Sequence, residues 1–348
     1  MKHIGGEVAI IGTTAWGTTL GIMLSHKGMK VTLWARTGEE AEILNREKEN
    51  SGRLPGFPFP EELSATASLG EALDQADLVI LAVPSQHMRH NVRQISAYLD
   101  SSMLVLSAAK GLELDSAKRM SQVIPEEIDS RFHHNICVLS GPNLSKEVAR
   151  GLPATTVVAG GDAAVATSVQ KMMASPLFRV YVNTDVVGVE LGGVLKNVIA
   201  LAAGMVDGLG YGDNTKAGLI TRGLAEITRL GVAAGASPLT FAGLAGLGDL
   251  VATCSSPLSR NRFVGQELAK GRPLKEITES MTGIAEGVTT TVAALKLAGG
   301  LKVEMPIAEQ VYRVLYEGLD VRQGIAELMG RKLKHEFADL RGSAIERT

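Results

Sequence analysis

Short apolar runs of strand length recur through the first half of the chain, and they limit the possible folds more than any other feature. The first run, at residues 7–12, reads Glu-Val-Ala-Ile-Ile-Gly, which is typical of a strand buried on both faces of a parallel sheet. Similar runs follow at residues 30–35, 77–83, 103–108, 136–140 and 155–159, and residues 178–182 are a last candidate. Helix-length segments separate them, so the pattern predicts an α/β fold with right-handed crossovers and a doubly wound parallel sheet.

The sequence changes in character after about residue 184. Long segments rich in Ala, Leu, Gly and Met replace the β-branched runs, and their apolar residues stand three and four positions apart. Ser237-Pro238 and Met305-Pro306 each place proline where a helix begins. Since one domain typically takes roughly 150 residues, we expect two domains: residues 1–187 with the sheet, and residues 188–348 forming an all-α domain.

Composition excludes several classes of partner. Lys and Arg together number 35 and Asp and Glu 37, so no net field favours nucleic acid. The two cysteines, Cys137 and Cys254, lack the spacing of a zinc site or a disulfide framework. His87 and His90 have no nearby carboxylate pair, so we predict no metal site. We expect no apolar run near the roughly 20 residues that span a bilayer, and therefore a cytoplasmic protein without membrane insertion.

The first strand leads into a turn that reads Gly-Thr-Thr-Ala-Trp-Gly, and a helix-like segment follows. In a dinucleotide-binding G-x-G-x-x-G turn, the first glycine makes the bend, the second admits the pyrophosphate and the third packs the helix on the strand. Gly12 and Gly17 take the first and third places, but Thr14 takes the second, where its side chain would crowd the phosphate. The pattern predicts a Rossmann-type NAD(P) domain. The alternative is an ordinary strand-turn-helix corner.

The second strand ends at Arg36, where a domain selective for NAD usually has an acid for the ribose hydroxyls. A guanidinium can stack on adenine or hold a 2′-phosphate through charge-assisted hydrogen bonds. We therefore expect NADP, or both NADP and NAD, as the cofactor. The alternative is a solvated surface arginine.

Reduction of a carbonyl by hydride requires an acid beside the carbonyl oxygen, and two lysines are candidates. Lys110 follows the run at residues 103–108, at the carboxyl edge of the sheet, unless it is a routine exposed lysine. Lys196 and Asn197 lie inside an apolar helical segment whose neighbouring positions include Gly192 and Ala200. Small residues around one amine predict a ligand-lined cavity, and desolvation lowers the pKa of a lysine. The alternative is an exposed helix face.

A second polar group lies further along the predicted helical domain. Asp249 follows Gly-Leu-Gly, and Ser259, Arg260 and Asn261 form a compact cluster. A guanidinium at this position can bind a phosphate bidentately, with the serine and asparagine adding neutral hydrogen bonds. Helix capping or surface salt bridges explain such a cluster about equally well.

Taken together, these segments resemble the bacterial-type glycerol-3-phosphate dehydrogenase family, and the blocks match in order from about residue 6 to residue 340. The blocks are residues 12–20, 54–56, 83–85, 109–111, 140–142, 194–198, 246–250, 259–262 and 285–287. The lysine-asparagine and arginine-asparagine-arginine blocks are the most specific. The sequence departs from the family at Thr14 and at Asn143-Leu144-Ser145, where the family has serine or threonine followed by Phe-Ala.

The resemblance implies interconversion of sn-glycerol 3-phosphate and dihydroxyacetone phosphate with NAD or NADP, for phospholipid synthesis. It also implies that Lys196 exchanges the proton, with Lys110 and Asp249 as its helpers in catalysis. The implied substrate-binding residues are Lys110, Gly141, Asn143, Lys196, Asn197, Asp249, Ser259, Arg260 and Asn261. The implied cofactor-binding residues are Gly12, Thr14, Ala15, Trp16, Gly17, Arg36, Lys110, Ser145, Arg260, Ile284 and Glu286.

Two other functions stay open at this point. One is a related two-domain dehydrogenase acting on a hydroxyacid such as a 6-phosphogluconate or ketopantoate analogue. The other is a nicotinamide-binding protein that has lost catalysis, for which Thr14 is the suggestive feature. A small molecule is the expected partner in every case, and a homodimer is expected on base rates alone.

Overall fold

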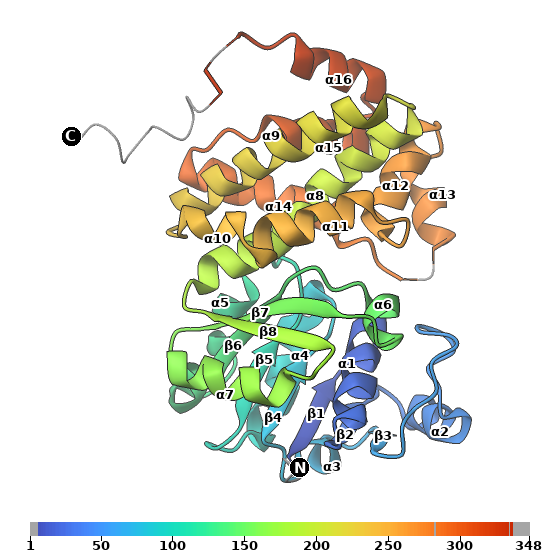
Figure 1. Ribbon diagram of the computed structural model, residues 1–348, viewed down its shortest axis with the longest axis vertical. Helices are drawn as coiled ribbons and strands as arrows, with labels where there is room; N and C mark the ends of the chain where they lie inside the picture. Colours follow the sequence, from blue (N-terminus) through green and yellow to red (C-terminus); the bar gives the residue numbers. More distant parts are fainter. Residues whose placement is uncertain (1–5, 282, 334, 337–348) are drawn as a thin grey trace, which may run out of the picture. The chain divides into compact units, whose positions relative to one another are not determined.

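The computed structural model describes residues 6–281, 283–333 and 335–336. The chain divides into two compact units, which we call the sheet unit and the helical unit (Figure 1). The sheet unit comprises Met1–Glu113 and Lys118–Glu190, and the helical unit comprises Leu114–Ala117 and Leu191–Thr348. The predicted boundary between residues 187 and 188 falls inside helix α8 (Val186–Gly208), whose first residues group with the sheet.

The sheet unit is built on one eight-stranded sheet of order β3-β2-β1-β4-β5-β6-β7-β8. The strands are β1 (Glu7–Ile11), β2 (Lys30–Trp34), β3 (Leu63–Thr66), β4 (Leu78–Leu81), β5 (Leu104–Ser107), β6 (Ile136–Ser140), β7 (Ala154–Gly160) and β8 (Phe178–Asn183). The first six strands are parallel and follow the order of a doubly wound dinucleotide fold. The α/β fold class predicted from the apolar runs is confirmed.

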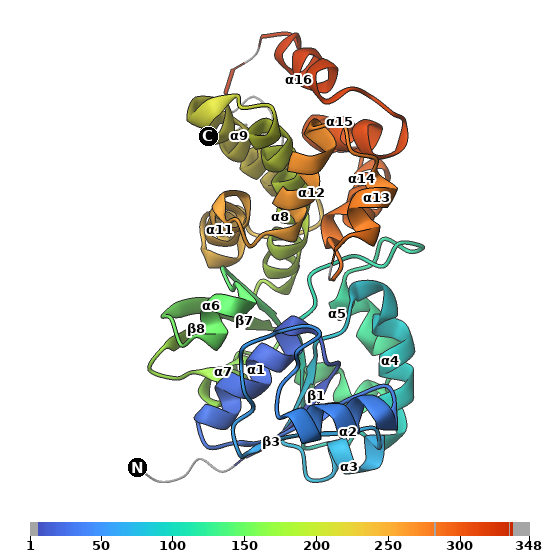
Figure 2. The same ribbon diagram turned by 90° about the vertical axis from the view of Figure 1, so that its right-hand side faces the viewer.

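Alternate residues of β1 enter two separate apolar cores, one on each face of the sheet. Val8 and Ile10 belong to the core that α1 and α7 cover, whereas Ala9 and Ile11 belong to the core that α4 and α5 cover. Figure 2 shows these two pairs of helices on opposite sides of the strands. Burial on both faces explains why the strands read as continuous apolar runs in the sequence.

The helices of the sheet unit are α1 (Ala15–His26), α2 (Gly38–Glu47), α3 (Leu69–Leu73), α4 (Met88–Ile95), α5 (Met120–Val123), α6 (Ser145–Ala149) and α7 (Ala163–Met173). Short 3-10 segments join them: η1 (Ser85–His87), η2 (Ser96–Tyr98), η3 (Ile124–Glu126) and η4 (Ser130–Asn135). Side-chain caps begin several of these helices, as at Thr37 before α2 and Asp162 before α7.

The sheet differs from the prediction in two places. Strand β3 was not predicted, because Leu-Ser-Ala-Thr is short and only half apolar. The pattern also predicted a fully parallel sheet, but β7 runs antiparallel to β6. A parallel return needs a helix that crosses a face of the sheet. The helix between these strands, α6, has five residues and packs against α1, so the chain turns straight back.

The helical unit contains nine α-helices within the described residues, as the composition after residue 184 predicted. They are α8 (Val186–Gly208), α9 (Gly212–Ala233), α10 (Pro238–Ala242), α11 (Asp249–Ser255), α12 (Arg260–Ala269), α13 (Leu274–Glu279), α14 (Glu286–Leu301), α15 (Pro306–Tyr316) and α16 (Val321–Met329). A π-helical turn, η5 (Leu244–Gly248), leads into α11. The expected helix starts at Pro238 and Pro306 are confirmed.

Helix α8 corrects one expectation about membranes. We expected no apolar run near membrane-spanning length, but α8 has 23 residues with a mean hydropathy of 1.7, which is long and apolar enough to qualify. Length and composition are weak criteria when only one helix meets them. The apolar 18-residue stretch of α8 is 89% buried inside the protein, as in the core helix of a globular fold.

Candidate active site

The turn between β1 and α1 has the backbone geometry that a dinucleotide pyrophosphate requires. Gly12 has φ +109°, a conformation that side chains rarely adopt, and a Cβ added there would lie 2.9 Å from Val83 Cγ1. A Cβ on Gly17 would collide with the Gly12 carbonyl oxygen. Ala15 and Trp16 begin α1, where the first N–H groups have no acceptor within the helix. The residues therefore fit a bound phosphate at a helix N-terminus.

Thr14 stands in the place of the second glycine, and its hydroxyl forms hydrogen bonds within the protein. Its hydroxyl donates to the Ala82 carbonyl oxygen at 2.7 Å and accepts from the Gly17 N–H at 3.1 Å. The side chain thus caps α1 and links it to the end of β4. The sequence suggested only a residue that crowds the phosphate, and this capping role was missed.

Arg36 is exposed just after β2, so both of its interpretations, cofactor binding and simple solvation, agree with its position. Its N–H donates to Glu40 Oε2 at 3.3 Å, and the hydroxyl of Thr13 donates to Glu40 Oε1 at 2.5 Å. Glu40 therefore links the end of β2 to the glycine turn. Glu40 was not predicted as a site residue.

Lys110 and Gly141 come together at the carboxyl edge of the sheet, after β5 and β6. The Lys110 amine donates to the Gly141 carbonyl oxygen at 2.9 Å. Gly141 has φ +154°, and a Cβ there would lie 2.9 Å from Thr156 Cα. Ser145 begins α6, and its carbonyl oxygen accepts from the Thr19 hydroxyl of α1 at 3.3 Å. Four parallel strands, β1, β2, β5 and β6, thus end in predicted site residues at one edge.

Three buried oxygens at this edge have no hydrogen-bond partner among the described residues. They are Ser107 Oγ at the end of β5, Ser140 Oγ at the end of β6 and Asn143 Oδ1 just beyond it. The other end of the Asn143 amide donates to the Thr155 carbonyl oxygen at 2.9 Å, which fixes the side chain. Buried polar atoms are nearly always paired in a complete structure, so this edge is suited to a polar ligand.

In the helical unit, Lys196 of α8 pairs with Asp249 of α11. The amine donates to Asp249 Oδ1 and, at 2.6 Å, to the Thr253 hydroxyl. Lys196 is 6% exposed and Asp249 is 1% exposed, which excludes the alternative of an exposed helix face. Thr253 was not predicted as a site residue. It lies four positions after Asp249 on one helix, and that spacing could have identified it.

Two glycines of α8 that were predicted to line a cavity pack against backbone instead. A Cβ on Gly192 would lie 2.6 Å from the Ala245 carbonyl oxygen, and one on Gly204 would collide with the Arg262 carbonyl oxygen. At these two positions, therefore, glycine allows close packing on η5 and α12. That packing brings the lysine and the carboxylate together.

Asn197 and Asn261 form a second buried contact between α8 and α12. The Asn261 amide nitrogen donates to Asn197 Oδ1 at 2.9 Å, and its oxygen accepts from the Gly287 N–H at 2.9 Å. Ser259 caps α12 by accepting from the Arg262 N–H at 3.2 Å. Ser259 and Asn261, which were predicted to bind phosphate, therefore also help to hold the helices of this unit in place.

The remaining predicted residues of this unit lie nearer the surface. Arg260 is exposed, Ile284 is 49% exposed and Glu286 is the first residue of α14. A Cβ on Gly283, which has φ +111°, would lie 2.5 Å from Arg260 Nη1, so this glycine leaves room for the guanidinium. Within the described residues no group of three or more His, Cys, Asp or Glu could hold a metal ion.

The similarity to known proteins extends over nearly the whole chain. The sequence models of the NAD-dependent glycerol-3-phosphate dehydrogenase N-terminus and C-terminus match residues 7–166 and 185–326. The chain is 55% identical to the glycerol-3-phosphate dehydrogenase [NAD(P)+] of Dehalococcoides mccartyi strain 195 over 95% of this chain and 93% of that protein. The corresponding protein of Moorella thermoacetica is 49% identical over 95% and 97%.

A solved structure agrees with these relatives. The crystal structure of glycerol-3-phosphate dehydrogenase from Coxiella burnetii superimposes with a TM-score of 0.89 and 36% identity. The similarity covers 94% of this chain and 99% of that one, so it includes both units.

Proposed function

Because the chain belongs to the NAD-dependent glycerol-3-phosphate dehydrogenase family, we propose that it interconverts sn-glycerol 3-phosphate and dihydroxyacetone phosphate with NAD or NADP. The observation that carries the proposal is the buried group of Lys196, Asp249 and Thr253. Placing a lysine in the core is costly, and a proton-transfer role accounts for keeping it there.

Lys196 acts as the proton donor to the substrate oxygen during reduction, and as the proton acceptor during oxidation. The Asp249 carboxylate and the Thr253 hydroxyl both accept hydrogen bonds from this amine, which limits the directions in which it can point. When bound, the nicotinamide supplies the hydride that the substrate carbon receives. Lys110, held by the Gly141 carbonyl oxygen, helps to orient the substrate at the edge of the sheet.

The cofactor's pyrophosphate would be held at the Gly12 turn by the backbone of Ala15 and Trp16, with Gly17 packing α1 close to the strand. Arg36 favours the 2′-phosphate of NADP. A comparison of NADPH with NADH in the parent enzyme tests this preference, and a strict requirement for NADH would contradict it.

The phosphate of the substrate would be bound by Arg260 with help from Asn261. An amide nitrogen carries two hydrogens, so the bond to Asn197 leaves the second N–H for a phosphate oxygen. The exposed guanidinium of Arg260 can make charge-assisted bonds to the same group. Unphosphorylated dihydroxyacetone is therefore expected to be a poor substrate.

The direct test follows the absorbance of NADPH, and then of NADH, with dihydroxyacetone phosphate as acceptor. Oxidation of either cofactor, with little oxidation when dihydroxyacetone replaces the phosphate ester, is the expected result. Turnover of a hydroxyacid substrate instead would favour the related dehydrogenases. Tight cofactor binding without any turnover would indicate a protein that has lost catalysis.

The substitution Lys196→Met tests the residue on which the mechanism depends. Loss of a general acid typically costs at least about a hundredfold in rate, so kcat should fall by that factor while the Kd for NADPH changes little. Thermal unfolding serves as the control for folding. A kcat within threefold of the parent would remove Lys196 from the chemistry.

We also propose a role in supplying glycerol 3-phosphate for phospholipid synthesis, a cytoplasmic location and a homodimer. Balanced charge and two buried free cysteines support an intracellular enzyme with a small-molecule substrate. Light scattering of the purified protein tests whether it is a dimer. Depletion of the protein from the cell that makes it tests the role in phospholipid synthesis.

A further inference from the structure

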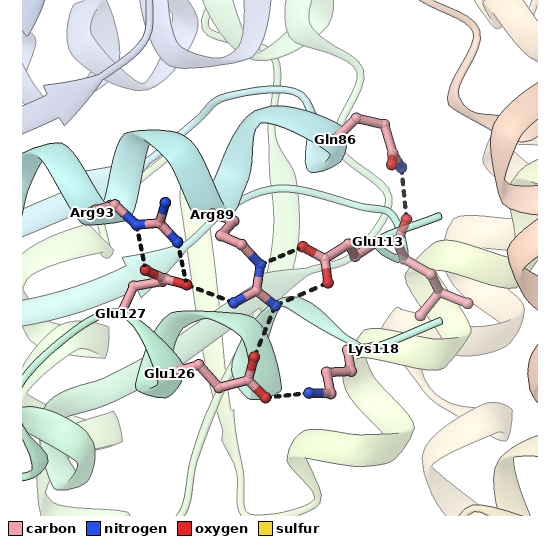
Figure 3. Close-up of polar contacts among 8 residues, drawn as sticks. Gln86, Arg89, Arg93, Glu113, Lys118, Glu126 and Glu127 are labelled. Carbon is pink, nitrogen blue, oxygen red and sulfur yellow. Dashed lines mark hydrogen bonds and ion pairs between the residues drawn. The ribbon is translucent and has the colours of Figure 1, made fainter. Parts of the chain in front are cut away.

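A network of six charged side chains lies beside the segment that carries Lys110, and nothing in the proposed chemistry uses it (Figure 3). We call it the Arg89 cluster. Its members are Arg89, Arg93, Glu113, Lys118, Glu126 and Glu127. Three cations balance three carboxylates, so the cluster has no net charge to attract an ionic ligand.

Arg89 lies at the centre of the cluster, with the three carboxylates around its guanidinium (Figure 3). Its Nε and Nη2 donate to the two oxygens of Glu113 at 2.7 and 2.9 Å, which is a bidentate pair. Its Nη1 donates to Glu127 at 2.6 Å and its Nη2 to Glu126 at 2.8 Å. One side chain from α4 thus joins the segment after β5 to the segment that follows α5.

The segment at residues 110–113 is held at several atoms. Gln86 donates to the Leu112 carbonyl oxygen at 2.7 Å, and the Glu113 N–H donates to the Lys118 carbonyl oxygen at 2.9 Å. At its other end the Lys110 amine donates to Gly141. The Glu113 carboxylate, three residues beyond Lys110, is bound by Arg89. Gln86 of η1 and Arg89 of α4 lie close together in the chain after β4. Both contacts therefore attach residues 110–113 to the same part of the sheet unit.

Stability alone does not account for this arrangement. The Arg89 and Glu113 side chains are 29% and 17% exposed, so water and salt reach the pair and reduce its contribution to the free energy of unfolding. A planar guanidinium that holds a carboxylate through two bonds does, however, restrict position and direction. We therefore propose that Arg89 is a positioning residue, which through Glu113 fixes the backbone that presents the Lys110 amine at the edge of the sheet. This inference rests on the proposed function.

The test compares Arg89→Gln with Arg93→Gln, a matched control one turn further along α4. Arg93 binds only Glu127 within the cluster, at 2.8 Å, and does not contact Glu113. Misplacing a group that orients substrate can cost about a hundredfold, so kcat/KM for dihydroxyacetone phosphate should fall between about tenfold and a hundredfold in Arg89→Gln. It should stay within about twofold of the parent in Arg93→Gln. Equal values for the two variants would overturn the proposal.

A double-mutant cycle with Lys110→Ala separates positioning from general damage. If Arg89 acts through Lys110, Arg89→Gln should lower single-turnover rates in the parent but not in the Lys110→Ala background. An equal loss in both backgrounds would show a merely structural effect and overturn the proposal. All variants are assayed at a temperature at which circular dichroism shows them folded.

Glu113→Gln provides the second variant if Arg89→Gln does not fold, because it leaves the other bonds of Arg89 in place. The same loss and the same cycle with Lys110→Ala are expected for it. Failure of the proposed function would look different: the parent itself would not oxidise NADPH or NADH with dihydroxyacetone phosphate. An active parent with unaffected Glu113→Gln and Arg89→Gln variants would refute the positioning role alone.

Discussion

The two units each contain a group of paired charges, and the groups differ in burial. Lys196 and Asp249 in the helical unit have side chains 7% and 2% exposed. In the sheet unit, the side chains of the Arg89 cluster range from 10% exposed in Glu127 to 67% exposed in Arg93. The first group consists of one ion pair with a hydroxyl beside it, whereas the second distributes its charge over six side chains.

This difference decides what each group does for the protein. Charges buried in a medium of low dielectric depend on each other, because water cannot replace a lost partner. Charges near the surface lose little when one partner is removed, since solvent and salt compensate. The buried pair should therefore affect both folding and chemistry, and the Arg89 cluster should affect chiefly geometry.

The largest expected effect comes from breaking the buried pair. Asp249→Ala leaves the Lys196 amine uncompensated, and such a change costs about 3 to 5 kcal/mol in the free energy of unfolding. Urea titration measures it. The control is Glu279→Ala, which removes one partner of the exposed Lys275 pair at 4.0 Å and should cost at most about 1 kcal/mol.

Removing both charges sharpens the same test. The double variant Lys196→Met/Asp249→Leu should recover most of the stability lost in Asp249→Ala, because no unpaired charge remains. It should stay as inactive as Lys196→Met. If the double variant were no more stable than Asp249→Ala, the lost stability would have a cause other than the unpaired amine.

Glu226 of α9 provides a buried charge without a hydrogen-bonded cation among the described residues. Its two oxygens accept the N–H groups of Ile307 and Ala308 at 2.9 Å, at the start of α15. Burial raises its pKa to about 7, although those N–H groups and nearby Arg229 oppose the shift and Glu309 adds to it. The folded protein therefore holds this proton more tightly than the unfolded chain does.

It follows that the stability from this group is complete below the unfolded pKa of 4.5 and is lost as the pH rises through about 7. At about 1.4 kcal/mol per pKa unit, the shift from 4.5 to about 7 corresponds to a loss of about 3 to 4 kcal/mol. Urea unfolding at about pH 5 and pH 8 should show this decline in the parent and a smaller one in Glu226→Gln. Glu279→Gln, on exposed α13, should decline like the parent.

The smallest effect is expected in the Arg89 cluster. Two of its carboxylates have pKa values below the usual range, that of Glu126 chiefly through Lys118 and that of Glu127 chiefly through Arg93. A depressed pKa means that the stabilisation is present above the unfolded value and disappears as the pH falls through the folded one. The Glu126→Gln/Glu127→Gln variant should unfold at slightly lower urea than the parent at neutral pH, and the gap should close toward acid pH.

Salt separates the two groups further. In about 1 M NaCl the Debye length is roughly 3 Å. The small difference in stability between the parent and Glu126→Gln/Glu127→Gln should therefore shrink, while the stability lost in Asp249→Ala should persist. Equal salt sensitivity of both groups would contradict the role assigned to burial.

Local sequence was enough to predict the features that depend on neighbouring residues. Continuous apolar runs predicted the strands, and the glycines at residues 12 and 17 predicted the turn, because burial on both faces and backbone sterics act within a few residues. The apolar setting of Lys196 likewise predicted a lysine that is not a surface residue. The family resemblance supplied the predicted roles of the individual residues.

Tertiary structure decided which distant groups meet. Three contacts join residues far apart in the chain: Lys196 with Thr253, Asn261 with Asn197, and Arg89 with Glu113. The same holds for the reversed direction of β7 and for the glycines of α8 that pack against backbone where a cavity was expected. A sequence pattern reports the local preference of a segment, whereas these contacts depend on how whole helices and strands pack, and packing is set by all of the segments at once.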